Sequence, residues 1–397
     1  MIQREEYLRH LARTKDIHII KVITGVRRCG KSTLLEQFQT ELRASGIPDK
    51  QILSLHFDRI EAEPLLNFHV LYDYIKSHLS NKRRTYIFLD EIQLVPNFQK
   101  TVLTLFEEEN VDLYLTGSNA ELLSGELATL LSGRYISISM LPFSFAEYWS
   151  FRKGTREAAW QDYFRYGGFP YLAQIEDETV RQDYLTGIYH TVLLKDVVAR
   201  RKIQDVLRLE DLTRFLLDNI GNLVSAKKIA DTMTSSGRKT TAATVEQDLH
   251  ALRDAYILYP CGRYDVQGKQ HLRSLQKYYV VDMGLRRIVL GEKNRDIGHA
   301  LENIVYLELI RRGYQVSIGK IGNREIDFIA EKDNQRAYYQ VAATVLDPDT
   351  FQRELQPLQA VRDNFPKYIL TLDTLPMGED GINQINVLDW LSRLGTE

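Results

Sequence analysis

Two periodicities of apolar and polar residues alternate along residues 1–150. Short runs of β-branched and aliphatic residues predict strands that are buried on both faces. Between them, apolar residues recur at helical spacing, as Leu34, Phe38 and Leu42 do. Strands that alternate with helices indicate a mostly parallel α/β sheet with right-handed crossovers. We predict a helix over 5–13 and strands over 17–24, 51–57, 85–90, 111–116 and 135–140.

The pattern changes twice after this region. From about residue 155 to 262 it is helical, and two short helices over 225–232 and 244–255 precede β-rich segments over 256–259 and 277–282. This order is typical of a helix-turn-helix followed by a β-wing, and therefore predicts a winged helix. Longer helices are predicted over 158–166, 178–201 and 207–219. An α/β pattern then returns, with a helix over 299–312 and strands over 314–318, 325–330, 336–345 and 367–372.

The composition narrows the class of protein. At roughly 100–200 residues per domain, 397 residues suggest two to four domains. The formal net charge is −2, so any contact with nucleic acid must come from a local patch. Two cysteines, Cys29 and Cys261, give neither a disulfide framework nor zinc spacing, which fits a reducing cytosol. The N-terminus shows no signal peptide and no apolar run approaches the roughly 20 residues of a membrane helix, so we expect a soluble, cytoplasmic protein.

A glycine-rich loop lies between the first long strand and the next helix. Residues 25–32 read Gly-Val-Arg-Arg-Cys-Gly-Lys-Ser. Glycines let such a loop wrap closely, so that backbone N–H groups and the helix N-terminus face a phosphate. Lys31 is expected to reach the β- and γ-phosphates of ATP, and Ser32 to bind Mg²⁺. Arg27 and Arg28 contact either phosphates or solvent. The predicted nucleotide-binding residues are Gly25, Arg28, Cys29, Gly30, Lys31, Ser32 and Thr33.

Two acids end the predicted strand over 85–90. In an ATPase of this class Asp90 would hold Mg²⁺ through water, and Glu91 would polarise the attacking water. The alternative for Glu91 is a solvated surface acid. At the end of the next strand, Ser118 or Asn119 could lie between these acids and the γ-phosphate, or could cap the helix that starts at Ala120. These residues form a second group of candidates for the same site.

An arginine precedes the last predicted strand of this region. Arg134 follows Gly133 and could act as an arginine finger in trans or read the γ-phosphate in cis. An ordinary surface arginine is an equally good interpretation. The sequence therefore leaves the role of Arg134 open, and with it the existence of a homo-oligomer.

These motifs together resemble a group of bacterial and archaeal AAA+-like ATPases that carry a C-terminal domain of unknown function. The resemblance covers nearly the whole chain and implies ATP and Mg²⁺ as cofactors. The matching segments are Gly25–Ser32, Leu89–Gln93, Thr116–Asn119, Gly133-Arg134, Leu141–Phe145 and Gly167–Pro170.

The C-terminal part of that group resembles the PD-(D/E)XK nuclease fold. This fold needs an acid on one strand and Glu-x-Lys on the next to hold Mg²⁺ and activate water. Here Glu302 and Asp327 are followed by Gln340-Val-Ala342. Gln340 brings no charge to a metal, and Ala342 cannot orient a water. We therefore expect no nuclease activity, and Glu302 and Asp327 would serve a DNA-binding or protein-docking platform or be structural acids.

The sequence predicts an α/β protein in four parts: a P-loop NTPase core with a parallel sheet (1–150), a helical lid (151–204), a winged-helix domain (205–295) and a nuclease-like α/β domain (296–397). The leading hypothesis is an ATP-hydrolysing switch or motor with DNA-related output, because Lys and Arg in 226–228 and 236–241 could contact the phosphates of double-stranded DNA. The alternative is a scaffold with slow ATP turnover that holds a protein partner. No membrane association is expected.

Overall fold

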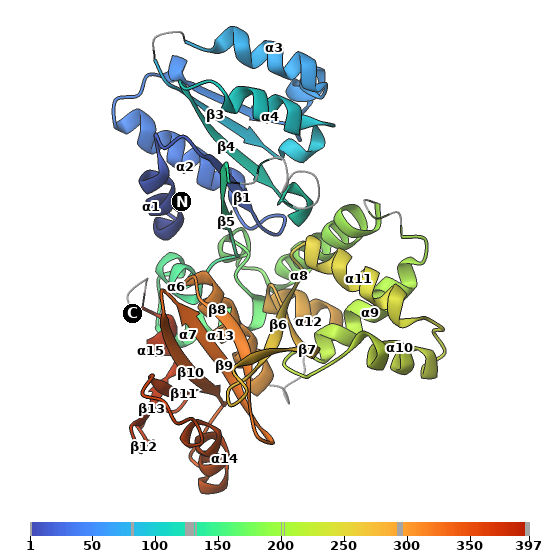
Figure 1. Ribbon diagram of the computed structural model, residues 1–397, viewed down its shortest axis with the longest axis vertical. Helices are drawn as coiled ribbons and strands as arrows, with labels where there is room; N and C mark the ends of the chain where they lie inside the picture. The colour runs from blue at the N-terminus through green and yellow to red at the C-terminus, as the bar shows by residue number, and fades with distance from the viewer. Residues whose placement is uncertain are drawn as a thin grey trace. The chain divides into compact units, whose positions relative to one another are not determined.

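The computed structural model describes residues 2–80, 83–123, 131, 133–199, 201, 203–291 and 297–393. These residues form two compact units, each described separately (Figure 1). The first comprises Met1–Met140 with Asp254–Tyr256, and the second comprises Leu141–Arg253 with Ile257–Glu397. The predicted boundary at 295/296 lies outside the described residues. Within the described ranges, no helix combines the length and apolarity needed to cross a membrane.

The first unit is built on a five-stranded sheet in which all neighbouring strands run parallel, in the order β2-β3-β4-β1-β5. This confirms the α/β fold with a parallel sheet that the sequence predicts. The predicted strand over 17–24 begins later, at Ile20, where pairing with Tyr135 starts; the carbonyl of Ile17 accepts a hydrogen bond from Lys21 Nζ at 2.8 Å. The strands are β1 Ile20–Thr24, β2 Ile52–His56, β3 Thr85–Asp90, β4 Val111–Gly117 and β5 Tyr135–Ser139.

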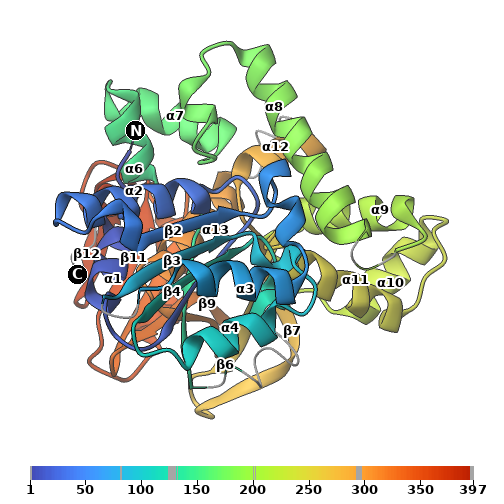
Figure 2. The same cartoon turned by 90° about the horizontal axis from the view of Figure 1, so that it is seen from above.

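Helices cover both faces of this sheet (Figure 1, Figure 2). On one face Phe38 of α2 packs against the rings of Phe88 and Tyr114. On the other face apolar residues of α3 and α4, such as Leu71 and Val102, join the buried core beneath the strands. Every residue of β3 and β4 is buried, which explains why both strands are largely apolar; the polar residues Asp112 and Thr116 of β4 are buried as well. The helices are α1 Glu5–Thr14, α2 Lys31–Ala44, α3 Phe68–His78 and α4 Phe98–Phe106.

The second unit begins with a largely helical region. The helix predicted over 178–201 divides into two parts, because α-helical geometry ends at His190 and a π-helix continues over Thr191–Ala199. The predicted pair of short helices is present as α10 and α11. The helices are α6 Phe145–Arg152, α7 Arg156–Tyr166, α8 Glu178–His190, α9 Val206–Asp218, α10 Ala226–Ser235, α11 Ala242–Asp254 and α12 Met283–Leu290.

An eight-stranded mixed sheet occupies the rest of the second unit, in the order β12-β13-β11-β10-β9-β8-β6-β7. The hairpin predicted as a wing forms β6 and β7, and β6 also pairs in parallel with β8. Segments on either side of the predicted boundary at 295/296 thus share one sheet, and the four-part division remains a prediction. The elements are β6 Leu258–Asp265, β7 Gln270–Val280, α13 Ile297–Arg311, β8 Gln315–Ile321, β9 Arg324–Lys332, β10 Gln335–Val341, α14 Pro348–Gln359, β11 Lys367–Thr371, β12 Gly378–Glu379, β13 Ile382–Asn386 and α15 Val387–Leu391.

Candidate nucleotide-binding site

The glycine-rich loop joins the end of β1 to the start of α2. Because β1, β4 and β3 are parallel neighbours, their carboxyl ends meet at the same edge of the sheet. This edge brings the loop over 25–30 together with Asp90 at the end of β3 and Gly117 at the end of β4. Ligands of open parallel α/β sheets bind at such an edge.

Backbone geometry explains the two loop glycines. Gly25 has φ +151°, and a Cβ there would lie 2.1 Å from the carbonyl oxygen of Met140. Gly30 has φ +104° and directly precedes α2. Any side chain at Gly25 would push the loop away from Met140, so glycine is needed for the close curvature.

The side chains between these glycines differ in their surroundings. Cys29 is fully buried, and burial raises the pKa of its thiol, which therefore stays neutral. Its carbonyl accepts a hydrogen bond from Arg4 Nη1 at 3.2 Å, and Arg4 is itself buried. Arg28 is exposed with φ +71°, and Thr33 lies half-buried in the first turn of α2. The residue that directly precedes α1 thus holds the loop, a contact that the sequence pattern did not reveal.

The ammonium of Lys31 is held at the loop itself. Its Nζ donates to the carbonyl oxygens of Gly25 and Val26 at 2.9 and 3.2 Å. It also lies 3.9 Å from Glu91 Oε1, although the Lys31 side chain is only 4% exposed. A buried ammonium that bonds neutral carbonyls can exchange them for the charged oxygens of a phosphate.

Asp90 is buried and surrounded by donors. The Thr116 hydroxyl donates to Oδ1, His56 Nδ1 lies 3.1 Å from Oδ2, and Ser32 contributes a further side-chain hydrogen bond. Burial alone would raise the pKa of Asp90, but the bonds from His56, Thr116 and Ser32 together lower it below its ordinary value. Asp90 therefore stays ionised near neutral pH.

His56 and Thr116 escaped the sequence analysis. His56 is the last residue of β2 and lies opposite Asp90 in the register of the two strands. Thr116 stands near the end of β4, on the other side of β3. The sequence did contain a signal for both residues: each is a polar residue at or near the end of a strand next to β3. Because parallel strands end at one edge of the sheet, such residues are expected to lie near Asp90.

Glu91 lies beside Asp90 in a left-handed conformation, with φ +53°. Its backbone N–H donates to Thr116 Oγ1 at 2.9 Å. Its Oε2 accepts from the hydroxyl of Ser118 at 3.0 Å and from the side-chain amide of Gln93. The structure thus brings Glu91 and Ser118 into one hydrogen-bonded group beside Lys31.

Asn119 and Arg134 are placed differently. Asn119 is buried and directly precedes the 3-10 turn Ala120–Leu123, whose Leu122 N–H donates to the Asn119 carbonyl. Arg134 precedes β5, and its carbonyl accepts from the N–H of Ile20, at the opposite end of the strands. Five residues at about 3.3 Å each separate this edge from the loop. The structure therefore does not place Arg134 with Lys31 and Asp90, and its role in trans stays a prediction.

Tyr256 is a further neighbour of the loop, far away in sequence. The segment Asp254–Tyr256 belongs to the first unit, and Tyr256 has φ +56°. Burial raises the pKa of Tyr256, and a side-chain hydrogen bond with Thr24 acts in the opposite direction. No local pattern in the sequence connects this tyrosine to the end of β1.

The residues at this edge suit a nucleotide with Mg²⁺. Mg²⁺ in nucleotide sites keeps several waters and takes one or two protein oxygens in addition to phosphate oxygens. The hydrogen bond between Ser32 and the ionised Asp90 places a hydroxyl and a carboxylate together beside Lys31. Such a donor set fits magnesium phosphate better than it fits a metal caged by protein ligands alone.

The C-terminal candidates come together in the second unit. Glu302 on α13 and Asp327 on β9 both approach Lys277 Nζ on β7, at 2.9 and 3.9 Å. Gln340 on β10 accepts a hydrogen bond from the backbone N–H of Asp327 at 2.7 Å. Ala342 directly follows β10. Lys277 was not among the candidates, because nothing in its local pattern links it to α13 or β9.

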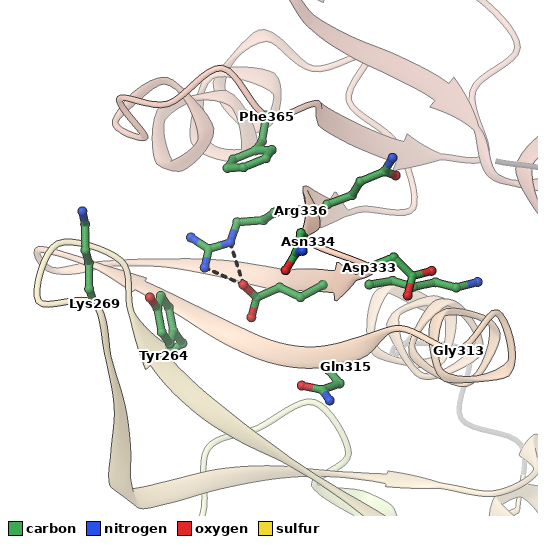
Figure 3. Close-up of a pocket in the computed structure, with 11 residues that line it drawn as sticks. Tyr264, Lys269, Gly313, Gln315, Asp333, Asn334, Arg336 and Phe365 are labelled. Atoms are coloured by element: carbon green, nitrogen blue, oxygen red, sulfur yellow. Dashed lines mark hydrogen bonds and ion pairs between the residues drawn. The ribbon is translucent and has the colours of Figure 1, made fainter.

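A separate open pocket of about 670 Å³ lies between β6, β9 and β10 (Figure 3). The guanidinium of Arg336 lies 5.2 Å from the ring of Tyr264 and 6.0 Å from that of Phe365. It also donates to Glu331 Oε1 from two nitrogens, so its charge is compensated. None of the predicted site residues lines this pocket.

Comparison with known proteins agrees with the fold of the chain. Residues 18–149 match the family model described as an AAA domain, and residues 157–296 match a domain of unknown function, DUF8612. The Walker-type ATPase of Pyrococcus abyssi is similar in fold, with a TM-score of 0.53 and 16% identity, over 73% of this chain and 96% of that one. Residues 18–149 therefore form a domain of the AAA type, in a fold similar to that of a Walker-type ATPase.

Two proteins with similar sequences show the family to which the chain belongs. An uncharacterised protein of Haemophilus influenzae is 40% identical over 98% of both chains. An uncharacterised protein of Methanocaldococcus jannaschii is 29% identical over 93% of this chain and 85% of that protein. The chain belongs to the same family as the Haemophilus protein.

Proposed function

We propose that the protein hydrolyses ATP in a Mg²⁺-dependent reaction at the carboxyl edge of the first sheet. The observation that carries this proposal is that Lys31, at the start of α2, lies 3.9 Å from Glu91, which directly follows Asp90 at the end of β3. This contact joins the phosphate-binding loop to the acidic strand end. The pair Ser32 and Asp90 would hold Mg²⁺, which when bound supplies positive charge against the phosphate oxygens.

Each remaining residue has a separate task. Lys31 exchanges the carbonyls of Gly25 and Val26 for β- and γ-phosphate oxygens, while backbone N–H groups of the loop face the phosphates. Glu91 accepts a hydrogen bond from the attacking water and polarises it. The bonds from Ser118 and Gln93 to Oε2 orient the carboxylate for this task.

The test is ATP hydrolysis by the purified full chain with Mg²⁺. Lys31→Ala should abolish turnover, because the phosphates lose their counter-charge. Lys50→Ala serves as a matched control, since Lys50 is an exposed lysine of the same unit. Unchanged turnover in the Lys31→Ala variant would contradict the assignment of ATP hydrolysis to this site.

We further propose a DNA-related output through the winged-helix region. The order α10, α11, β6 and β7 supports this proposal, as does the exposure of Lys227, Lys228 and Lys239. Against it, Arg238 forms an ion pair with Asp211 at 2.7 Å, which favours the second candidate, a nucleotide-regulated scaffold for a protein partner.

Hydrolysis measured with and without double-stranded DNA at moderate salt distinguishes these outputs. Stimulation by DNA that disappears in Lys227→Ala/Lys228→Ala supports the DNA-related output, because phosphate contacts need local positive charge. Slow turnover that ignores DNA supports the scaffold. Arg134 is exposed, and a role as an arginine finger in trans requires that chains associate. This role is supported only if turnover per chain rises with protein concentration.

A further inference from the structure

A buried ammonium lies among carboxylates in the second unit, far in sequence from the ATPase motifs. Lys277 Nζ is 2.9 Å from Glu302 Oε1, 2.7 Å from Glu325 Oε1 and 3.9 Å from Asp327 Oδ1. The side chains of Lys277 and Glu302 are 4% and 7% exposed, and that of Asp327 is 16% exposed. Three acids from α13 and β9 therefore surround one cation from β7.

Two of these carboxylates also accept hydrogen bonds from other groups of the protein. Glu302 Oε1 also accepts from the hydroxyl of Tyr279 at 2.5 Å. Asp327 Oδ2 accepts from the backbone N–H of Val341 at 2.8 Å. Both acids are thus held by hydrogen bonds from β7 or β10 in addition to the ammonium.

Gln340 has a structural reason to be an amide. Its Oε1 accepts from the N–H of Asp327 and its Nε2 donates to Glu354 Oε2, both at 2.7 Å. A glutamate in this place could accept the first bond but would set a second carboxylate against Glu354. The neutral amide therefore bridges β9 and α14 and adds no charge to the cluster.

These contacts do not fit the Mg²⁺ that the nuclease resemblance implies. Mg²⁺ needs near-octahedral oxygen ligands at about 2.0–2.1 Å and retains several waters. The ammonium of Lys277 stands within bonding distance of two of the acids and carries the same sign of charge. In the part of the chain that the structure describes, no group of three or more His, Cys, Asp or Glu is arranged to hold a metal ion.

We infer that Lys277 is a built-in counter-ion, whose ammonium takes the place of a divalent cation between Glu302, Glu325 and Asp327. Glu302 and Asp327, the more buried of these acids, need compensation by opposite charge, and Lys277 supplies it from within the chain; the side chain of Glu325 is 37% exposed. The cluster joins β7 to α13 and β9 without a metal. Without the ammonium, the three acids lose their counter-charge, and we expect the excess negative charge to draw in a hard divalent cation around which the carboxylates rearrange.

The experiment measures Mn²⁺ binding to the full chain by titration calorimetry, without nucleotide. All samples carry Asp90→Asn, which removes the acid of the ATPase site. The affinity of the Lys277→Ala variant for Mn²⁺ should be at least 10-fold higher than that of this parent. Adding Asp327→Asn to the Lys277→Ala variant should abolish this gain in affinity. Lys320→Ala, on β8 of the same sheet, should bind as the parent does.

Two outcomes overturn the inference. One is a folded Lys277→Ala variant that binds no more Mn²⁺ than the parent. The other is a parent whose Mn²⁺ affinity falls when Asp327→Asn is added, since the native cluster would then already hold a metal. This second comparison leaves Lys277 unchanged and therefore tests the inference even if the Lys277→Ala variant does not fold. Equal Mn²⁺ affinities of the parent and its Asp327→Asn variant support the built-in counter-ion.

Discussion

The carboxylate of Asp282 accepts a hydrogen bond from the backbone N–H of Gly168 at 2.6 Å, across 114 residues of sequence. It also accepts from the N–H of Gly284 at 2.8 Å, at the start of α12. A Cβ on Gly167 would lie 2.0 Å from Asp282 Oδ1, and one on Gly284 would lie 2.1 Å from the carbonyl oxygen of Tyr166. Gly167 and Gly284 are therefore needed for the close approach between the segments around 167 and 282–284.

Asp282 should make the stability of the protein depend on pH. Burial raises the pKa of Asp282 to about 7, against the opposing bonds from Gly168, Gly284 and Leu285. In the unfolded chain the pKa lies near 3.8, so the folded state binds the proton more tightly between these values. This contribution to stability is complete below about pH 4 and is lost as pH rises through about 7.

Urea unfolding at pH 5, 6, 7 and 8 measures this effect. The free energy of unfolding of the wild type should fall between pH 5 and 8 relative to Asp282→Asn, by on the order of a few kcal/mol. The asparagine variant is the matched comparison, because its amide does not titrate and its side-chain oxygen can still accept from the Gly168 N–H. A difference between the two proteins that does not vary with pH would show that Asp282 does not titrate in this range.

Gly167→Ala should destabilise the second unit. The added Cβ meets Asp282 at 2.0 Å, and the backbone φ of +80° disfavours any side chain. A loss of at least about 1–3 kcal/mol in the free energy of unfolding is expected, as for strained backbone positions. Gly187→Ala, in α8 with open space around its Cβ, should instead be neutral or stabilising by up to about 1 kcal/mol. Equal effects of the two substitutions would contradict the close-approach argument.

The sequence predicted what depends on local pattern. The strand over 85–90 was predicted with its observed bounds, because the apolar run Tyr86–Leu89 lies between the polar residues Thr85 and Asp90. The loop residues from Gly25 to Ser32 were also predicted from local sequence, because strand, loop and helix follow one another along the chain. Ser118 could be placed near Glu91 because parallel strands end at one edge.

Contacts between distant segments were not predictable in this way. Lys277 reaches Glu302 and Asp327 through the pairing of β6 with β8, which no local periodicity encodes. Tyr256 reaches Thr24 although the two residues lie far apart in the sequence. The end of α-helical geometry at His190 was not predicted either, because the sequence over 178–201 keeps its helical spacing.

The buried pair of Lys21 and Asp112 should behave as one unit in stability measurements. Both side chains are almost fully inaccessible, and Asp112 also accepts from the hydroxyl of Tyr114 at 2.9 Å. Lys21→Met leaves Asp112 buried without its counter-ion, so we expect a loss of about 3–5 kcal/mol in urea unfolding. The double variant Lys21→Met/Asp112→Asn should be less destabilised than Lys21→Met alone. Lys50→Met, at an exposed position, should change stability by less than about 0.5 kcal/mol.

Glu91→Gln should separate ATP binding from ATP hydrolysis. The amide keeps the size of the side chain but is a poor base, so turnover should fall by at least about 100-fold while ATP still binds. Single-turnover hydrolysis and equilibrium binding of ATP, measured on the same preparation, check the two halves of this prediction.

Ser118→Ala provides the graded comparison for Glu91. It removes one donor to Glu91 Oε2 and leaves the Gln93 amide in place, so the carboxylate is less well oriented but still present. A hydrogen bond to a charged group is worth about 1.5 kcal/mol at its lower end, which corresponds to about a 10-fold loss of turnover. If Ser118→Ala lowers turnover as much as Glu91→Gln does, Ser118 acts directly on the reacting groups; if Glu91→Gln turns over at the wild-type rate, the base is another residue.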